Sequence, residues 1–369
     1  MTSEKEGQDP RQHVGRASGG ATIRAALAAA CAGPSPLLAP GSSILIACSG
    51  GADSTALLAG LAALAAERPQ LTLSVSAGHV DHGLRATSAD EARQVETVAA
   101  RLGVSCRVRR LASLEQEIAR VGLEAAARSA RYAALAGLAV EAGAQIVVTG
   151  HTRRDQAETL LLRLARGAGP SALSGVRERR DLAPGVALVR PLLAVPRSAT
   201  EALCEELGLP VVHDPQNDDA ARSRTRVRQA FADLAALLNP RLEEALAGTA
   251  TLLAAEDDLL GSLAAAALER ASDGQGAFRT ADLLALHPAL QRRALVMAAL
   301  AASGRPERQH VEALRTLLAR SQQDGPAALH LPGAQAQVTR GLLRFSPPAP
   351  RARPADPRAS EVAEVLPSG

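Results

Sequence analysis

The fold is indicated first by residues 43–54, which have the sequence SILIACSGGADS. The apolar run Ile44–Ile46 predicts a buried strand, and the Ala/Leu-rich residues 55–67 predict a helix after it. A strand that passes through a glycine turn into a helix is the local unit of α/β proteins, in which helices cover a parallel sheet.

The turn in this unit has the features of a phosphate-binding loop. Ser49, Gly50 and Gly51 let the backbone approach an anion closely, and the N–H groups at the start of the helix face it. The lysine and the glycine spacing of a Walker A loop are absent. An ordinary strand-to-helix turn would explain the glycines but not the polar residues Asp53 and Ser54.

Outward from this unit, short β-rich runs continue to alternate with Ala/Leu-rich segments. Further strands are predicted at residues 71–75, 104–108 and 146–148. The alternation predicts an α/β fold with a parallel sheet and helices on both of its faces. Such sheets bind ligands beyond the carboxyl ends of their strands, so functional residues are expected in the segments that follow the strands.

After about residue 240 the strands give way to long Leu/Ala segments. We therefore expect an α/β domain at 21–240 and a smaller helical domain at 241–346, which ends in a β-hairpin with Pro332 and Gly333 at its turn. The polar and the Pro/Arg-rich ends of the chain predict disordered tails at 1–20 and 347–369.

Composition excludes several classes of protein. Among the 41 basic residues of this 369-residue chain, Lys5 is the only lysine, and a genome-wide bias toward arginine is the simplest explanation of that excess. The four cysteines are too far apart for a C-x-x-C zinc, iron–sulfur or redox site. No apolar run is long enough to span a membrane, so we expect a cytoplasmic protein. A homodimer is one alternative for its oligomeric state.

A second polar segment, HVDHGLR at 79–85, follows the second predicted strand. It places His79, Asp81, His82 and Arg85 where a ligand is expected. Its two histidines are three residues apart in a glycine-containing loop, which is weak spacing for a metal site.

A third segment is the predicted helix around residues 123–132. Arg128 and Arg131 are three residues apart and therefore lie on one helix face. Glu124 lies one turn before Arg128, so a solvated face of ion pairs is one interpretation of this segment.

The fourth segment follows the fourth predicted strand and begins with His151. Asp155 and Glu158 share one face near the start of the next helix. Acidic residues in a first turn also complement the helix dipole, but that explanation leaves His151 without a role.

Taken in order, these segments resemble one family. The SGGADS turn is similar to the pyrophosphate-binding loop (PP-loop) of the N-type ATP pyrophosphatases, which have an adenine-nucleotide α-hydrolase-like fold and cleave ATP between its α and β phosphates. Residues 79–85 resemble the H-x-[DN]-H-x-L-R element of the tRNA(Ile)-lysidine synthetases, and residues 150–159 resemble their G-H-x-x-D-D-Q-A-E-T pattern. The resemblance is strong over residues 43–240 and weak beyond them.

The resemblance implies roles for individual residues. It implies an ATP site made of Ser49, Gly50, Gly51, Ala52, Asp53, Ser54 and His79. It implies catalytic roles for Asp53, Arg128, Arg131, His151, Asp155 and Glu158, and contacts to substrate or tRNA by Asp81, His82, Arg85, Arg222, Arg224 and Arg228. Mg²⁺ would be held by Asp53 and Glu158, because this hard cation prefers carboxylate oxygens.

Two positions depart from the family pattern. Arg154 occupies the place of the first Asp in the D-D pair, so metal or lysine binding would rely on Asp155 and Glu158 alone. Thr225 replaces an Asn within the arginine-rich segment 222–228, whose alternate arginines would share one face of a strand but spread around a helix. That segment is either a contact to RNA or a brace between domains, or else a solvated helix.

The reaction implied by the resemblance uses ATP and free L-lysine. ATP adenylates O2 of the wobble cytidine in the CAU anticodon of tRNA(Ile), and the lysine amine then attacks C2 and releases AMP. The expected enzyme is a ligase that forms a carbon–nitrogen bond. The alternatives are a PP-loop tRNA thiolase, which needs a persulfide cysteine or a cluster, and an ATP-binding module without catalytic activity.

Overall fold

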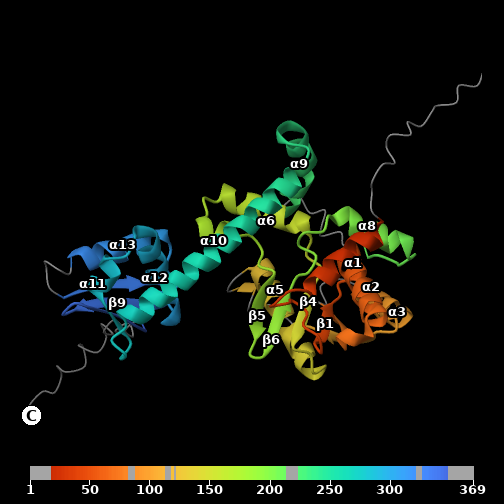
Figure 1. The fold of residues 1–369 in the computed structure, drawn as a ribbon, viewed down its shortest axis with the longest axis horizontal. Helices are drawn as coiled ribbons and strands as arrows, with labels where there is room; N and C mark the ends of the chain where they lie inside the picture. The colour runs from red at the N-terminus through yellow and green to blue at the C-terminus, as the bar shows by residue number, and fades with distance from the viewer. Residues whose placement is uncertain are drawn as a thin grey trace, which may run out of the picture. The chain divides into compact units, whose positions relative to one another are not determined.

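The computed structural model describes residues 18–81, 88–112, 118–119, 122–212, 223–320 and 326–347. The chain forms two compact units that divide between Ala254 and Ala255. In chain order, the elements of the first unit are α1 (Gly19–Ala30), β1 (Ser43–Ala47), α2 (Ala52–Glu67), the 3₁₀ turn η2 (Pro69–Leu71), β2 (Ser74–Asp81), α3 (Ser88–Arg101), β3 (Ser105–Arg110), α5 (Leu123–Glu141), β4 (Ile146–Thr149), α6 (Arg153–Ala165), α7 (Pro170–Leu173), β5 (Arg179–Ala183), β6 (Val186–Val189), α8 (Arg197–Glu206), α9 (Ser223–Leu238) and the first part of α10 (Leu242–Ala271) (Figure 1).

The strands of the first unit form one sheet in the order β3-β2-β1-β4-β6-β5. All neighbours are parallel except β5, which runs antiparallel to β6. The central strand β1 is apolar because it is covered on both faces, and Ile44, Leu45 and Ile46 are fully buried. The predicted parallel sheet is therefore confirmed, and β1, β3 and β4 match the predicted strands.

Strand β2 begins later than the sequence predicted. Residues 69–71 form η2, and Thr72 has a left-handed φ of 47°, so the chain becomes extended only at Ser74. The strand then continues to Asp81, and His79 lies within it rather than after it. The pair β5 and β6 was not predicted, because β5 carries Arg179, Arg180 and Asp181 and has no apolar run.

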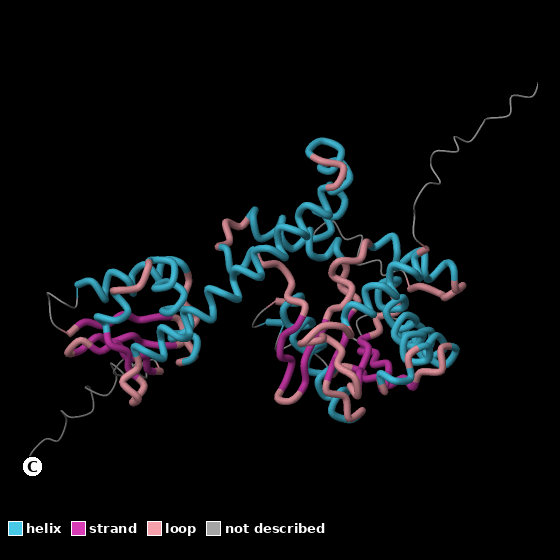
Figure 2. Tube along the Cα trace, in the orientation of Figure 1, coloured by secondary structure: helices cyan, strands magenta, loops and turns pink. Residues whose placement is uncertain are grey.

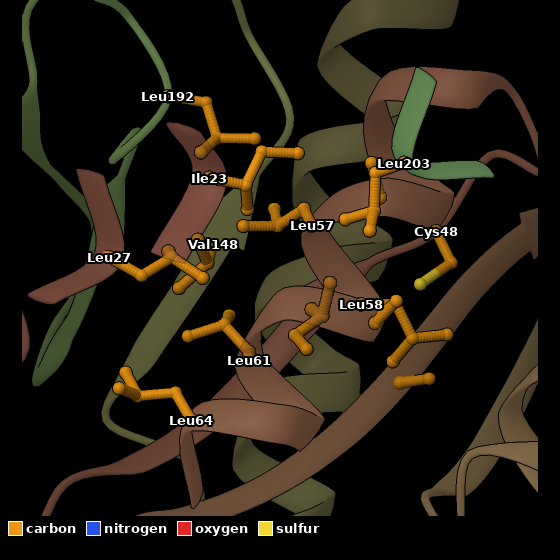
Figure 3. Packing of buried hydrophobic residues seen from close by; sticks show 14 of the residues in the cluster. Ile23, Leu27, Cys48, Leu57, Leu58, Leu61, Leu64, Val148, Leu192 and Leu203 are labelled. Atoms are coloured by element: carbon orange, nitrogen blue, oxygen red, sulfur yellow. The ribbon is translucent and has the colours of Figure 1, made fainter. Parts of the chain in front are cut away.

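Helices cover both faces of this sheet. On one face α1, α2 and α8 enclose a core that includes Ile23, Leu57 and Leu203 (Figure 3). On the other face α5 packs its buried side chains, among them Leu135 and Leu138, against β1, β4 and β6. The apolar faces of the helices thus hold the carboxyl ends of β1 and β4 in a fixed position.

Helix α1 begins at Gly19, inside the segment that was predicted to be a tail. Ser18 Oγ accepts from the Ala21 N–H, and the Glu206 carboxylate accepts from the N–H groups of Gly19 and Gly20. These acceptors bind N–H groups that have no partner within the helix. Residues 348–369, most of the predicted C-terminal tail, lie outside the described part of the chain.

The second unit has its own sheet and core. After α10 come β7 (Ala277–Arg279), α11 (Thr280–Leu284), α12 (Pro288–Ala301), α13 (Arg308–Arg320), β8 (Ala327–Leu331), β9 (Ala334–Thr339) and β10 (Leu342–Ser346). The predicted hairpin with Pro332-Gly333 at its turn is present as β8 and β9, and β10 and β7 extend it to an antiparallel sheet in the order β7-β10-β9-β8 (Figure 2). Leu295, Leu314 and Leu343 are fully buried in its core.

Within the described residues, none of the helices combines the length and the apolar composition that a membrane crossing requires.

Candidate active site

The turn between β1 and α2 is held in shape by its own serines. Ser54 Oγ donates to the Gly51 carbonyl at 3.0 Å and accepts from the Ser49 N–H at 3.1 Å. Gly51 is the N-cap of α2 and makes no side-chain hydrogen bond to the first N–H groups of the helix. Those groups and the positive end of the helix dipole therefore remain for an anionic ligand.

Two glycines allow the close packing around this turn. Gly50 has a φ of 84°, which other residues rarely adopt, and a Cβ there would lie 2.7 Å from Val212 Cγ2. Gly150 follows β4, and a Cβ there would lie 2.7 Å from the carbonyl oxygen of Asp53. The segment after β4 therefore lies directly against the first turn of α2.

Asp53 is the acidic residue of that first turn. Thr200 Oγ1 donates to Asp53 Oδ1 at 2.5 Å, and Arg197 Nη1 lies 3.9 Å from Oδ2. Burial raises the pKa of Asp53, and the contacts with Thr200 and Arg197 only partly oppose this effect, to which the charge of Asp155 adds. A cation beside this carboxylate would favour its charged form.

The end of β2 carries two of the expected residues, and His79 lies next to the turn. His79 is buried, and its Nδ1 lies 2.8 Å from the Cys48 carbonyl oxygen, to which it donates. Asp81 is also buried and lies 3.9 Å from Arg110 Nε. His82, Arg85 and Arg222, which the resemblance implied as substrate contacts, lie outside the described residues.

Helix α6 begins with a capping box. Asp155 Oδ2 accepts from the N–H of Thr152 at 2.8 Å, which is the structural role expected of an acidic residue in a first turn. Its other oxygen, Oδ1, accepts from Arg224 Nη2 at 2.5 Å. Asp155 therefore has both a capping and an ion-pairing role.

Glu158, one turn further along α6, is fully buried and bound by arginines of α9. Its Oε2 accepts from Arg224 Nε at 2.8 Å, and its Oε1 accepts from Arg228 Nε at 2.9 Å. We call Asp155, Glu158, Arg224 and Arg228 the α6–α9 clamp. Burial would raise the pKa of Asp155, but Arg224 and His151 outweigh burial and hold this pKa below its ordinary value.

The arginine-rich segment forms a helix rather than a strand. Residues 223–238 are a helix, and Arg224 and Arg228 share its inner face, whereas Arg226 is exposed. The two arginines connect α9 to α6 within the first unit.

His151 lies between β4 and α6, and its Nδ1 is 2.9 Å from Thr149 Oγ1. Burial lowers its pKa to about 3; Asp155 opposes this shift, whereas the charges of Arg190, Arg224 and Arg131 add to it. The imidazole is therefore neutral at physiological pH and is a hydrogen-bonding group rather than a cation.

Arginines surround Tyr132, the only tyrosine of the chain. The guanidinium groups of Arg128, Arg131 and Arg180 lie 5.0, 5.5 and 4.8 Å from the centre of its ring. Burial would raise the pKa of Tyr132, but the charges of Arg128, Arg131 and Arg190 outweigh this and lower it. We call the arginines around this ring the arginine cluster; they are Arg128, Arg131, Arg180 and Arg190.

Arg154, the residue that departs from the family pattern, has its own partners. Its guanidinium group lies 4.3 Å from the centre of the Phe231 ring on α9, and its Nε lies 3.4 Å from Glu243 Oε2 at the start of α10. Arg153 Nε lies 3.2 Å from the other oxygen of Glu243. The start of α6 is thus braced against α9 and α10.

The structure brings the turn, Asp53, His79, His151 and Asp155 to the carboxyl ends of β1, β2 and β4, where the sequence placed them. Sequence reasoning missed the contacts from Thr200 and Arg180, and it gave Arg190 no role of its own. Arg190 had a signal, because it opens the sequence Arg-Pro-Leu-Leu directly after a buried strand. Thr200 had none, since it reaches Asp53 from a helix 147 residues away.

Two protein-family models match the chain. The model described as PP-loop domain matches residues 25–234, and the model described as TilS substrate binding domain matches residues 278–344. The first match covers more than half of the chain and lies within the first unit; the second lies within the second unit.

Relatives align along most of the chain. A protein of Salinispora tropica named tRNA(Ile)-lysidine synthase is 42% identical over 301 residues, which cover 79% of this chain and 86% of the relative. A protein of the same name from Leifsonia xyli is 40% identical over 349 residues, which cover 88% of this chain and 99% of the relative.

Among solved structures, the chain resembles a U34-tRNA thiolase from Methanococcus maripaludis that was solved with its 4Fe-4S cluster. The TM-score is 0.52 at 17% sequence identity, and the match covers 63% of this chain and 78% of the thiolase. At this identity the likeness concerns the fold alone.

Proposed function

Because the chain belongs to the tRNA(Ile)-lysidine synthase family, we propose that it is an ATP-dependent ligase that forms lysidine on tRNA(Ile). ATP adenylates O2 of the wobble cytidine in a CAU anticodon and releases pyrophosphate. The side-chain amine of lysine then attacks C2 of the cytidine, and AMP leaves. The observation that carries the proposal is the meeting of a phosphate-binding turn with the carboxylates of α6 at one edge of the sheet.

The first step assigns the β1–α2 turn to the triphosphate. Backbone N–H groups from Gly51 onward and the Ser49 hydroxyl are the donors that we assign to this anion. Ser54 donates to the Gly51 carbonyl and so keeps the turn in shape. His79 is held by its Nδ1 against the Cys48 carbonyl, which leaves Nε2 as a hydrogen-bond acceptor for the nucleotide. Of the two arginines expected to stabilise phosphate charge, Arg131 is half-buried and close to His151, and we assign it this role.

The donor set fits Mg²⁺ bound together with ATP. Within the described residues, no three His, Cys, Asp or Glu side chains gather into a ready-made metal site. Mg²⁺ commonly takes one or two carboxylates and completes its shell with phosphate oxygens and water. Asp53 fits this need, because its partly buried carboxylate has only Thr200 and a distant Arg197 as partners among the described residues. When bound, the ion would neutralise charge on the leaving pyrophosphate.

Glu158 is the weaker candidate for a metal ligand. Both of its oxygens already accept from guanidinium groups, so it would have to release an arginine first. We assign Asp155 to the binding of lysine, because among the described residues only one of its oxygens is held by a cationic side chain, that of Arg224. Glu158, whose two oxygens are both bound, holds Arg224 and Arg228 in position. Arg224 stands in for that ligand: its Nη2 lies where an ammonium N–H group of lysine would donate.

The tRNA is the second macromolecular partner of the proposed reaction. We propose that the first unit carries out the chemistry and that the second unit contributes to tRNA selection, since every assigned phosphate and carboxylate contact lies before Ala254. A cytoplasmic location and a homodimer remain predictions; size-exclusion chromatography with light scattering tests the latter.

The cysteines argue against a tRNA thiolase. A sulfur carrier needs a reactive thiolate or closely spaced cluster ligands. Burial raises the pKa of all four thiols, those of Cys106 and Cys204 to about 11. None of them combines exposure with a lowered pKa.

The decisive experiment is mass spectrometry of tRNA(Ile) after incubation with the protein, ATP, Mg²⁺ and isotope-labelled lysine. The expected product carries the labelled lysine on the wobble cytidine. ATP–pyrophosphate exchange that depends on tRNA would accompany it. Sulfur incorporation would identify a thiolase instead, and ATP binding without exchange would identify an inactive module.

A further inference from the structure

The outer half of the arginine cluster has no role in the ATP and lysine sites proposed above. Arg128 and Arg180 are exposed, and one lies on α5 and the other on β5. Both have their guanidinium groups against Tyr132. Two segments more than 50 residues apart thus supply cations to one aromatic ring, which is 9% exposed.

No carboxylate of the described residues balances the charge of the cluster. Arginine stays charged at any physiological pH. Within the part of the chain that the structure describes, none of Arg128, Arg131, Arg180 and Arg190 forms an ion pair with a carboxylate. Arg190 is 2% exposed, and its Nε is buried without a hydrogen bond. Four neighbouring cations with a buried unused donor indicate a site for an anion.

The cluster extends outward from the catalytic residues. Arg131 and Arg190 are close enough to His151 to influence its pKa, and Arg128 influences the pKa of Arg163 on the outer part of α6. The inner members thus face the site of chemistry, and the outer members Arg128 and Arg180 are reached from solvent. A ligand that contacts both the inner and the outer members must therefore reach from buried side chains to solvent.

We propose that Arg128 and Arg180, stacked on Tyr132, bind the phosphodiester backbone of the substrate RNA beside the nucleotide that enters the active site. The identity of the RNA rests on the proposed function. Tyr132 restrains two long side chains, so their planes are fixed before the RNA arrives and less rotamer freedom is lost on binding. The outer faces of these planes also remain for an unpaired base, in a chain that has few exposed aromatic rings for stacking.

The test measures the binding of an anticodon stem–loop RNA to the full chain without ATP or lysine. Fluorescence anisotropy gives the affinity over a range of salt concentrations. For the double variant Arg128→Ala/Arg180→Ala we expect affinity to fall about tenfold or more, and the slope of log K against log salt to decrease by about 1.5, since each lost phosphate contact removes about 0.7–0.9. Arg93→Ala is the matched control, because Arg93 is equally exposed and already paired with Asp90. It should leave both quantities unchanged.

A second pair of variants separates charge from orientation. Tyr132→Phe keeps the ring and should bind RNA within about twofold of the unaltered chain. Tyr132→Leu keeps the arginines but removes their platform, so the affinity should fall while the salt slope stays the same. If Tyr132→Leu loses its folded structure, the exposed double variant still decides the question.

The outcomes that overturn the proposal are distinct from failure of the proposed function. Unchanged RNA affinity and salt slope in Arg128→Ala/Arg180→Ala would overturn it. So would a tenfold rise in the KM for ATP with RNA binding intact, since the phosphate would then belong to ATP. A third outcome is that the unaltered chain forms no lysidine, while the double variant still binds RNA more weakly than the unaltered chain. The RNA site then stands and the proposed reaction does not.

Discussion

Asp53 meets two demands that ordinarily conflict, because burial raises its pKa while the proposed metal contact needs the carboxylate charged. We expect Asp53→Ala to reduce ATP–pyrophosphate exchange by about 10²–10³-fold, the usual effect of losing one preorganised electrostatic contact. Asp53→Asn is the informative control, since the amide oxygen still accepts from Thr200 but carries no charge. Both variants should fail equally. Near-normal exchange by Asp53→Asn would assign Asp53 a structural role.

His151 provides a test of pH dependence. The folded state holds its pKa near 3, whereas the unfolded imidazole titrates near its ordinary value of 6.5. The unfolded chain therefore binds a proton first, and the stability that comes from the neutral imidazole is complete above about pH 6.5 and lost as the pH falls toward 3. For His151→Asn, which retains a partner for Thr149, the free energy of unfolding in urea should fall less between about pH 7.5 and about pH 5 than it does in the unaltered chain. Identical pH profiles would contradict the neutral assignment.

The α6–α9 clamp is the feature to test among the elements. In Arg224→Ala/Arg228→Ala the fully buried Glu158 loses both of its cations, which should lower the free energy of unfolding by about 3 kcal/mol or more. Adding Glu158→Gln to this double variant removes the isolated charge and should recover much of the loss. Urea denaturation of the three chains measures both effects. If Glu158→Gln instead lowers stability further, the loss in the double variant does not come from an unpaired buried charge on Glu158.

Elements that are decided by local sequence were predicted well. β1 and β4 have unbroken apolar runs, and α6 begins at an acidic first turn, so their positions follow from periodicity and capping. β5 was missed, because it is an edge strand with charged residues and is fixed by pairing with β6 rather than by its own pattern.

Contacts between distant segments limited the prediction of the site. Residues 49–54 and 151–158 were singled out because each set forms a short motif within one strand-to-helix segment. The partners of Glu158 and Asp53, namely Arg228 and Thr200, come from helices that only the tertiary fold brings into contact. Alternate arginines at 222–228 gave no indication that two of them would be turned inward, since that depends on the register of α9 against α6.

For the whole molecule, a fragment that ends at Ala254 keeps the sheet, the phosphate-binding turn, the clamp and Glu243. We expect it to bind ATP within a few-fold of the full chain and to form no lysidine, because the second unit is proposed to select tRNA. Circular dichroism and a thermal melt establish that the fragment is folded. Lysidine formation at the rate of the full chain would remove the second unit from substrate selection.

The effect of replacing Arg154 depends on its contacts with Phe231 and Glu243. The common family residue at this position is Asp, yet Arg154 now stacks on Phe231 and meets Glu243. In Arg154→Asp the new carboxylate would lie beside that of Glu243, and the Phe231 ring would lose its guanidinium partner. The free energy of unfolding should therefore fall by about 1–3 kcal/mol, with a lower melting temperature. The pair Arg154→Asp/Glu243→Arg should regain most of this, whereas Glu243→Arg alone should not be tolerated beside Arg153 and Arg154. The two positions are therefore coupled, and exchanging them together should cost less stability than changing either one alone.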